Sequence, residues 1–254
     1  MIYISHFYII KLLLNGNSLL KLQIIKMMIK YKDREDAGRI LAKELKAAAE
    51  SRGISLDQDN TIILAIPDEG IIPGYIISKE LNLKMNLLVV GKLKVTGTDT
   101  GFGSISIDGT TVFNDAMINR YRLTRKKINI IEKSVLDKMI NRIETYDIAQ
   151  INLNILKDKI VIIVDEGAQT GYSMMAAIKS INLIVPRVIV VGLPTASFQS
   201  IMIINRYSKH ICCSKIIDSF FFHIKDAYEH YHKLDEKTVL EYIDKIKKEN
   251  LLLI

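Results

Sequence analysis

Residues 161–174 combine two acids with a loop of small residues, and this combination could bind a sugar phosphate. The run from Val161 to Val164 is apolar, Asp165 and Glu166 follow it, and a loop of small and hydroxyl residues leads on to Ser173. The backbone N–H groups of such a loop, with the start of a helix behind it, form a cradle for phosphate. Carboxylates one step away can accept hydrogen bonds from sugar hydroxyls. A phosphate site beside a diol site describes a ribose 5-phosphate.

A second acidic loop nearly repeats the first. Asp68, Glu69 and Gly70 follow an apolar run that ends at Pro67. If the two runs are neighbouring strands, four carboxylates share one crevice. Each pair of like charges at ~4 Å costs on the order of 4 kcal/mol at an effective dielectric near 20, unless a cation intervenes. The sequence therefore predicts either a metal ion at Asp68 and Glu69 or a site that has lost its affinity for a strongly anionic group.

The elements around both loops alternate between apolar runs and helical patterns. The apolar runs predict buried strands over residues 61–67, 86–93, 159–165, 187–193 and 211–217. Helical spacing predicts helices over 33–52, 71–81, 125–146, 170–182 and 235–248. This alternation predicts an α/β fold with a Rossmann-like parallel β-sheet and helices on both faces. Residues 94–111 are rich in Gly, Thr, Ser and Asp, which predicts a small inserted hood or hairpin. Ligands of such sheets bind at the carboxyl ends of the strands, where both acidic loops would lie.

Composition and charge narrow the classes of partner. The 254 residues are 49% apolar and 25% charged, which is a globular balance. Four of the seven net positive charges are lysines within residues 1–30, which contain no Asp or Glu, so the rest of the chain carries +3. That small charge, with no aromatic residues among the basic ones, predicts no nucleic-acid partner. Cys212 and Cys213 are adjacent and cannot form a disulfide framework, so we expect reduced thiols and a cytoplasmic protein.

The N-terminal segment differs from the rest of the chain. Its apolar runs are shorter than the ~18–20 residues that a membrane span requires. We interpret residues 1–27 as an extension or a misassigned start and residues 28–254 as one domain. An amphipathic segment on a membrane surface is the alternative reading of residues 1–27. We favour the first interpretation and therefore expect no membrane partner.

The loop from Val161 to Ser173 resembles the phosphoribosyltransferase signature that binds phosphoribosyl pyrophosphate (PRPP). That signature consists of apolar strand residues, two acids, a short loop, Thr-Gly and then Ser or Thr. The wider chain resembles the stand-alone phosphoribosyltransferase-like proteins of bacteria and archaea. The segments that carry this resemblance, in chain order, are Tyr31–Gly38, Ala65–Pro67, Lys92–Leu93, Gly101–Ser104, Asp108–Gly109, Asn114, Pro194–Ala196 and Ala227–Glu229.

The resemblance implies a role for each matching residue. Asp165, Glu166 and Lys92 would be catalytic, the two acids binding the ribose hydroxyls and the lysine neutralising the pyrophosphate. The PRPP-binding loop would comprise Asp165, Glu166, Gly167, Ala168, Gln169, Thr170, Gly171, Tyr172 and Ser173. The loop facing the pyrophosphate would comprise Pro67, Asp68, Glu69 and Gly70. Mg²⁺ would bind together with PRPP, and a nitrogen nucleophile would displace pyrophosphate at the ribose C1.

The chain departs from the family pattern at two places, and these leave the function open. The pyrophosphate loop is acidic, and Gly91 stands where family members often have an arginine before the lysine. One hypothesis is an enzyme that transfers the phosphoribosyl group to a nitrogenous base or another small nitrogen nucleophile. The alternative is a non-catalytic, regulatory protein that binds a ribose phosphate or a nucleotide, and a plain interaction protein is a third. The exposed helix faces would allow a homodimer.

Overall fold

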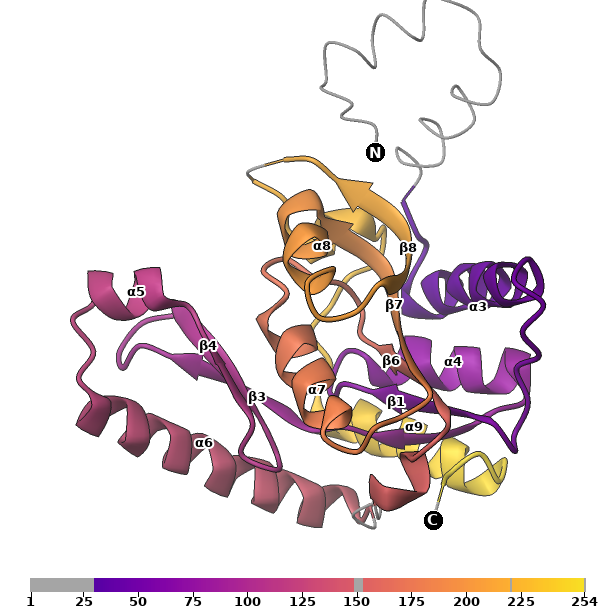
Figure 1. Cartoon of the computed structure of the whole chain (residues 1–254), viewed down its shortest axis with the longest axis horizontal. Helices are drawn as coiled ribbons and strands as arrows, with labels where there is room; N and C mark the ends of the chain where they lie inside the picture. The colour runs from indigo at the N-terminus through magenta and orange to yellow at the C-terminus, as the bar shows by residue number, and fades with distance from the viewer. Residues whose placement is uncertain (1–29, 149–152, 220, 254) are drawn as a thin grey trace, which may run out of the picture.

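The computed structural model describes residues 30–148, 153–219 and 221–253, and a five-stranded parallel sheet lies at its centre (Figure 1). Its strand order is β2-β1-β6-β7-β8. Every neighbouring pair in this order is parallel. The strands are β1 (Thr61–Ala65), β2 (Lys84–Leu87), β6 (Ile160–Val164), β7 (Val188–Ser197) and β8 (His210–Ile217). All residues of the central strand β6 and of its neighbour β1 are buried, as continuous apolar runs require.

Helices cover both faces of this sheet. Side chains that alternate along β1 and β6 enter two separate apolar cores, so that Ile63 belongs to one core and Leu64 to the other. The first core also contains residues of α3 (Arg34–Glu50), α4 (Ile71–Leu81) and α9 (Glu236–Lys248). The second core contains residues of α7 (Tyr172–Asn182) and α8 (Phe198–Ile204). The predicted α/β fold with a Rossmann-like parallel sheet and helices on both faces is confirmed.

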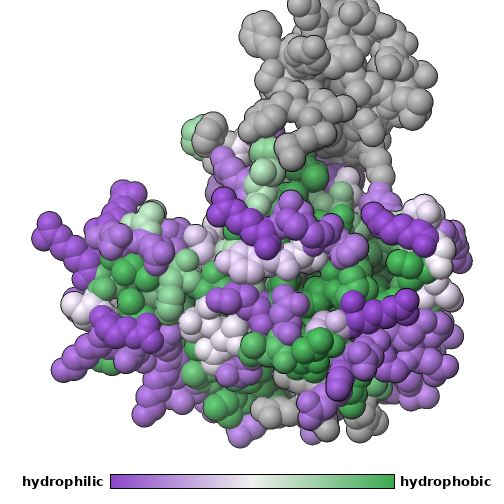
Figure 2. All heavy atoms as spheres, viewed as in Figure 1, coloured by the Kyte–Doolittle hydropathy of each residue, from purple (hydrophilic) through white to green (hydrophobic). Residues whose placement is uncertain are grey.

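An inserted region lies to one side of the parallel sheet, at the left of Figure 1, and we call residues 90–146 the hood. It contains an antiparallel sheet of β3 (Val90–Lys94), β4 (Gly101–Ser106) and β5 (Thr111–Phe113), followed by α5 (Asp115–Arg120) and α6 (Arg125–Tyr146). The hood has its own apolar core, which includes Leu93, Phe102 and Met139. In Figure 2 the outer margin of the hood carries hydrophilic residues, with some apolar residues between them on this face. The predicted insertion is confirmed, and its antiparallel sheet has three strands.

The predicted strand over residues 86–93 is wrong in one respect, because the chain changes sheets within it. β2 ends at Leu87 in the parallel sheet, and β3 begins at Val90 in the hood. Leu87, Leu88 and Val89 are all buried, but they belong to three different apolar cores. A run of consecutive apolar residues indicates that the residues are buried, but it does not show which sheet each of them joins. Lys92 therefore belongs to the hood.

The start of the described chain pairs with residues 227–229, which precede the last helix. The Tyr31 N–H donates to the Ala227 carbonyl at 2.8 Å, and the Glu229 N–H donates to the Tyr31 carbonyl at 2.7 Å. Two short 3₁₀ helices, η1 (Leu153–Leu156) and η2 (Ile224–Ala227), complete the elements of the described residues. Among the described helices, none is both long enough and apolar enough to cross a membrane. The interpretation of residues 1–27 as an extension lies outside the described residues.

Candidate active site

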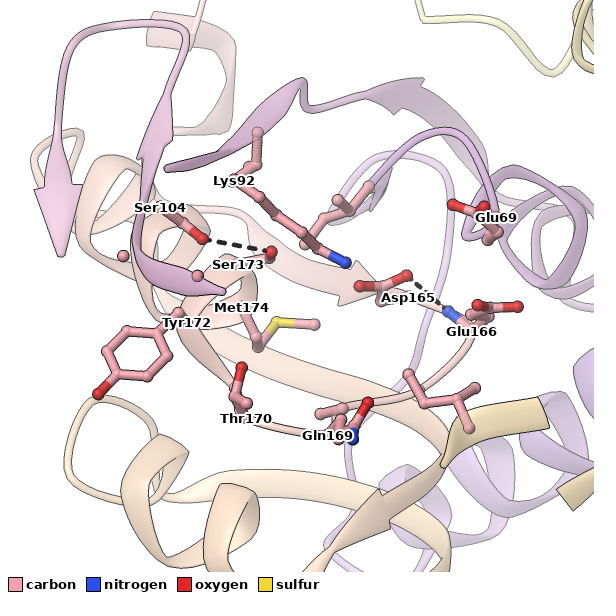
Figure 3. A pocket seen from close by; sticks show the side chains of 18 of the residues that line it. Glu69, Lys92, Ser104, Asp165, Glu166, Gln169, Thr170, Tyr172, Ser173 and Met174 are labelled. Carbon is pink, nitrogen blue, oxygen red and sulfur yellow. Dashed lines mark hydrogen bonds between the residues drawn. The ribbon is translucent and has the colours of Figure 1, made fainter. Parts of the chain in front are cut away.

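A pocket of about 610 Å³ opens at the carboxyl ends of β1 and β6, between the parallel sheet and the hood (Figure 3). β1 and β6 are direct neighbours, with Ala65 paired to Val164, so the two acidic loops begin side by side. The β6–α7 loop supplies one wall, with every residue from Asp165 to Ser173 in the lining. The hood supplies the opposite wall, which includes Lys92, Lys94, Gly101, Gly103, Ser104, Asn114 and Met117.

The β6–α7 loop leads into a helix that starts without a side-chain cap. The N-cap residue of α7 is Gly171, whose φ of 80° lies in the left-handed region that favours glycine. The first N–H groups of a helix have no acceptor within the helix, and here no side chain among the described residues caps them either. Thr170 is exposed at the end of this loop, and Ser173 follows in the first turn. The loop therefore brings backbone donors, hydroxyl groups and the positive end of the helix dipole together, and its role as a phosphate cradle stays a prediction.

Hydrogen bonds fix the shape of this loop. The Ser197 N–H donates to the Ala168 carbonyl, and the Ser197 Oγ donates to the Gln169 carbonyl, both at 2.9 Å. Gly167 packs closely against β7, because a Cβ on it would lie 2.9 Å from the Thr195 carbonyl oxygen. On the other side, Ser104 of the hood lies with its Oγ 3.5 Å from the Ser173 Oγ. The loop is thus held between β7 and the hood before any ligand binds.

Asp165 is the acid that faces the middle of the pocket. In Figure 3 its carboxyl group and the Lys92 ammonium group point toward one another. The Asp165 Oδ1 also accepts a hydrogen bond from the Glu166 N–H at 2.7 Å. Burial, and next the negative charge of Glu166, raise the pKa of Asp165 to about 8, and the charge of Lys92 only partly offsets this. Asp165 can therefore hold a proton near neutral pH and can lose it when a cation approaches.

Glu166 has a different environment, although it is the next residue. Its carboxylate accepts from the Arg34 Nε at 2.7 Å and from the Tyr231 hydroxyl at 3.1 Å. The Tyr228 hydroxyl donates to its carbonyl at 2.7 Å, and the Arg34 Nη1 donates to the His232 carbonyl at 2.9 Å. Burial raises the pKa of Glu166, and Arg34 opposes this rise. Its predicted contact with a ribose hydroxyl stays a prediction, because the structure places this carboxylate against Arg34.

Sequence reasoning missed Arg34 and Tyr231 as parts of the site. Arg34 is 3% exposed in the first turn of α3, and its guanidinium lies 4.6 Å from the centre of the Tyr231 ring. The signal that could have found Arg34 was a charged residue one position after the N-cap Asp33, in a segment that carries the family resemblance. No spacing rule relates it to Glu166, which lies 132 positions away.

The β1–α4 loop presents only one of its two carboxylates to the pocket. Pro67 and Glu69 line the pocket, whereas Asp68 and Gly70 do not. Asp68 accepts from the Arg142 Nη2 at 2.8 Å and from the Tyr146 hydroxyl, both on α6. The peptide bond between Pro67 and Asp68 is cis. The expected crevice of four carboxylates is therefore wrong, because α6 of the hood draws Asp68 out of it.

The expectation of a metal ion at Asp68 and Glu69 has no support from this geometry. Within the described part of the chain, His, Cys, Asp and Glu side chains form no group of three or more that could hold a metal ion. Asp68 already accepts hydrogen bonds from a guanidinium and a phenol. Mg²⁺ commonly binds through one or two carboxylates together with substrate phosphates, and Glu69 and Asp165 are pocket carboxylates that suit this mode.

The hood explains why glycine stands at position 91. A Cβ on Gly91 would lie 2.2 Å from the Val135 Cγ1 and 2.8 Å from the Met139 Sδ, because α6 packs directly on β3 there. An arginine side chain would not fit between the helix and the strand. The positive charge expected before Lys92 is therefore absent, and the space belongs to the helix that carries Arg142.

Comparisons with known proteins agree with this fold. No family model matches the chain. Two Mycobacterium tuberculosis proteins, each named "Putative phosphoribosyl transferase", are 24% identical over 220 residues, which is 86% of this chain and 47% of theirs. The chain thus spans about half the length of the curated relatives it matches. The crystal structure of TT1426 from Thermus thermophilus superposes with a TM-score of 0.67 at 20% identity, over 85% of this chain and 99% of that one. The chain is thus similar in sequence to proteins that carry this name, and it is similar in fold to TT1426.

Proposed function

We propose that this protein binds PRPP with Mg²⁺ and transfers its phosphoribosyl group to a nitrogenous base or another small nitrogen nucleophile. One arrangement carries this proposal. The pocket has the uncapped start of α7 at one end, Asp165 in the middle and Lys92 reaching over from the hood. These groups match the 5-phosphate, the ribose and the pyrophosphate of PRPP in order. The sequence similarity to proteins named for this class supports the same reading.

The described residues would act by position and charge. The N–H groups at the start of α7, with the hydroxyls of Thr170 and Ser173, would hold the 5-phosphate. The Asp165 carboxylate would accept hydrogen bonds from the ribose hydroxyls. The bond from the ribose C1 to the pyrophosphate oxygen breaks, the bond from the nitrogen to C1 forms, and the nitrogen then loses its proton. Lys92 would stabilise the negative charge that develops on the departing pyrophosphate.

Mg²⁺ would supply further charge neutralisation on the pyrophosphate. Asp165 and Glu69 would be its protein partners, since both line the pocket beside Lys92. Burial and the charge of Glu166 hold the pKa of Asp165 near 8 in the free protein. A nearby cation favours the ionised form of this carboxyl group. We therefore expect the affinity for PRPP to rise with pH up to about pH 8.

Calorimetry with PRPP, with and without Mg²⁺, tests the binding step. We expect binding that depends on Mg²⁺, followed by pyrophosphate release when a panel of bases and small amines is added. Lys92→Met should weaken PRPP binding strongly. Lys94→Met is a matched control from the same strand, because its ammonium already pairs with Asp99 at 2.9 Å. The absence of PRPP binding under every condition would contradict the proposal.

A non-catalytic binding protein is the second candidate, and Glu69 is the observation that favours it. This carboxylate lines the pocket on the loop that should face the pyrophosphate. If it repels the pyrophosphate, the protein would bind ribose 5-phosphate or a nucleoside monophosphate and not PRPP. Tight binding of these ligands without release of pyrophosphate from PRPP would support this candidate over the enzyme.

A further inference from the structure

The inference concerns the pairing of Asp68 with helix α6, and it rests on the proposed binding of PRPP. Arg142 and Tyr146 are four positions apart on α6, so they lie on the same side of the helix and reach the same carboxylate. Arg142 donates to the Asp68 Oδ2 at 2.8 Å, and Tyr146 donates to the Oδ1. Both oxygens of Asp68 therefore have a donor from the hood.

The pairing changes the charge that the pocket presents. Asp68 directly precedes Glu69, which lines the pocket, and its own side chain is only 14% exposed. Without Arg142 the loop would carry two uncompensated carboxylates beside the place proposed for the pyrophosphate. With Arg142 the charge of Asp68 is neutralised and its carboxylate is held outside the pocket lining. The pairing therefore reduces the like-charge repulsion expected from the loop sequence, and Glu69 is the carboxylate of this loop that lines the pocket.

The position of α6 brings further positive charge to the same side of the loop. A second cavity, of about 560 Å³, runs between β3 and α6. Its charged lining residues are all basic, namely Lys92, Lys94, Lys138 and Arg142. Lys92 lines both this cavity and the main pocket. The close packing of α6 on Gly91 is what allows the helix to carry Arg142 to Asp68.

We propose that Arg142 and Tyr146 are positioning residues for the pyrophosphate loop, and that they make an acidic loop compatible with a pyrophosphate ligand. They do so by holding Asp68 away from the pocket and neutralising it. The arginine that compensates the acidic loop is therefore Arg142 of the hood helix α6. It is not an arginine before Lys92 on β3, where this chain has Gly91. The role is specific to ligands that carry a pyrophosphate.

A charge-rescue cycle tests this proposal by calorimetry with PRPP and Mg²⁺. Arg142→Gln should weaken PRPP binding about tenfold, because it leaves the Asp68 carboxylate unpaired beside an anion. Asp68→Asn should tighten binding, since it removes the carboxylate and leaves Arg142 positively charged. The double variant should bind far better than Arg142→Gln, because no unpaired carboxylate remains. Arg142→Lys should retain most of the affinity, and Tyr146→Phe should weaken binding less than Arg142→Gln.

Two controls separate this role from a structural one. Ribose 5-phosphate carries no pyrophosphate, so its affinity should be the same in the wild type and in Arg142→Gln. Lys133→Gln alters an exposed lysine of the same helix that lines neither cavity, and it should leave PRPP binding within about twofold of the wild type. An equal loss of affinity for both ligands, or a double variant no better than Arg142→Gln, would overturn the proposal. A wild-type protein that does not bind PRPP would instead overturn the proposed function.

Discussion

The two acidic loops have the same three residues in the same order, Asp-Glu-Gly, but the structure uses them in opposite ways. In the β1–α4 loop the first acid, Asp68, is paired and Glu69 lines the pocket. In the β6–α7 loop the second acid, Glu166, is paired and Asp165 faces Lys92. Each paired acid has one arginine and one tyrosine as donors. Two like carboxylates in one loop are thus tolerated because one of them has a cationic partner.

The two pairs differ in burial, and burial decides what each pair does for the protein. The Arg34 and Glu166 side chains are 3% and 8% exposed, and the Arg142 and Asp68 side chains are 41% and 14% exposed. A buried charge without its partner cannot recover the interaction from water. We therefore expect the Arg34 pair to act mainly on stability, whereas the Arg142 pair acts mainly on the charge of the pocket.

The largest expected effect is the loss of stability in Arg34→Met. The change leaves Glu166 buried without its cation, which should lower the free energy of unfolding by about 3–5 kcal/mol. Urea denaturation monitored by circular dichroism measures this value. Arg39→Met is a matched control on the same helix, because Arg39 pairs with Glu35 at an exposed site and should cost less than about 1 kcal/mol. Equal losses in the two variants would remove the distinction between a buried and an exposed pair.

Asp165→Asn should stabilise the free protein, and the gain should depend on pH. The folded pKa near 8 lies above the ordinary value for Asp, so in the pH range between these two values the folded state keeps a proton that the unfolded state loses. Ionisation therefore lowers the stability of the wild type as the pH rises from about 4 to about 8. Asparagine does not ionise, so the variant should be more stable by at least about 2 kcal/mol at pH 8 and hardly different at pH 4.

Unfolding by urea at pH 4, 6 and 8 measures this difference. Asp99→Asn is the control, because Lys94 lowers the pKa of exposed Asp99, and the variant should not gain stability as the pH rises. If the stability of Asp165→Asn changes with pH in the same way as that of the wild type, the pKa of Asp165 is not raised in the folded protein.

Gly91→Ala tests whether the position of α6 matters to the β1–α4 loop. The added Cβ would clash with Val135 and Met139, and such overpacking should cost about 1–3 kcal/mol. Gly101→Ala adds the same atom on the next strand, 3.9 Å from its nearest neighbour, and should be close to neutral. Differential scanning calorimetry compares the two. If Gly91→Ala also weakens PRPP binding more than Gly101→Ala does, the effect reaches the pocket through the helix that holds Asp68.

The smallest expected effect on stability belongs to Arg142→Met. Because Arg142 is 41% exposed, its pair with Asp68 should contribute no more than about 1 kcal/mol, and the loss should shrink at high salt. Urea denaturation at low and high ionic strength measures this. A loss as large as that of Arg34→Met would contradict the proposed division between a stabilising pair and a pocket pair.

Local pattern predicted most of the elements. The helices over 71–81 and 125–146 have the predicted bounds, and the strand that ends before Asp165 lies at the centre of the parallel sheet. These elements were predictable because the burial of each residue shows in the spacing of apolar side chains. The same pattern could not show that the chain leaves the parallel sheet between Leu87 and Val90, since buried residues of two sheets are equally apolar.

The sequence by itself determined the fold class, the two acidic loops and the small-residue turn before α7. Only the tertiary structure decided which acid of each loop pairs with an arginine. That choice depends on Arg34, which lies 132 positions from Glu166, and on Arg142, which lies 74 positions from Asp68. Spacing along the chain determines which residues share a face of one element. Which charges meet across elements depends on how a helix packs, and here α3 and the hood helix α6 assign opposite roles to two nearly identical loops.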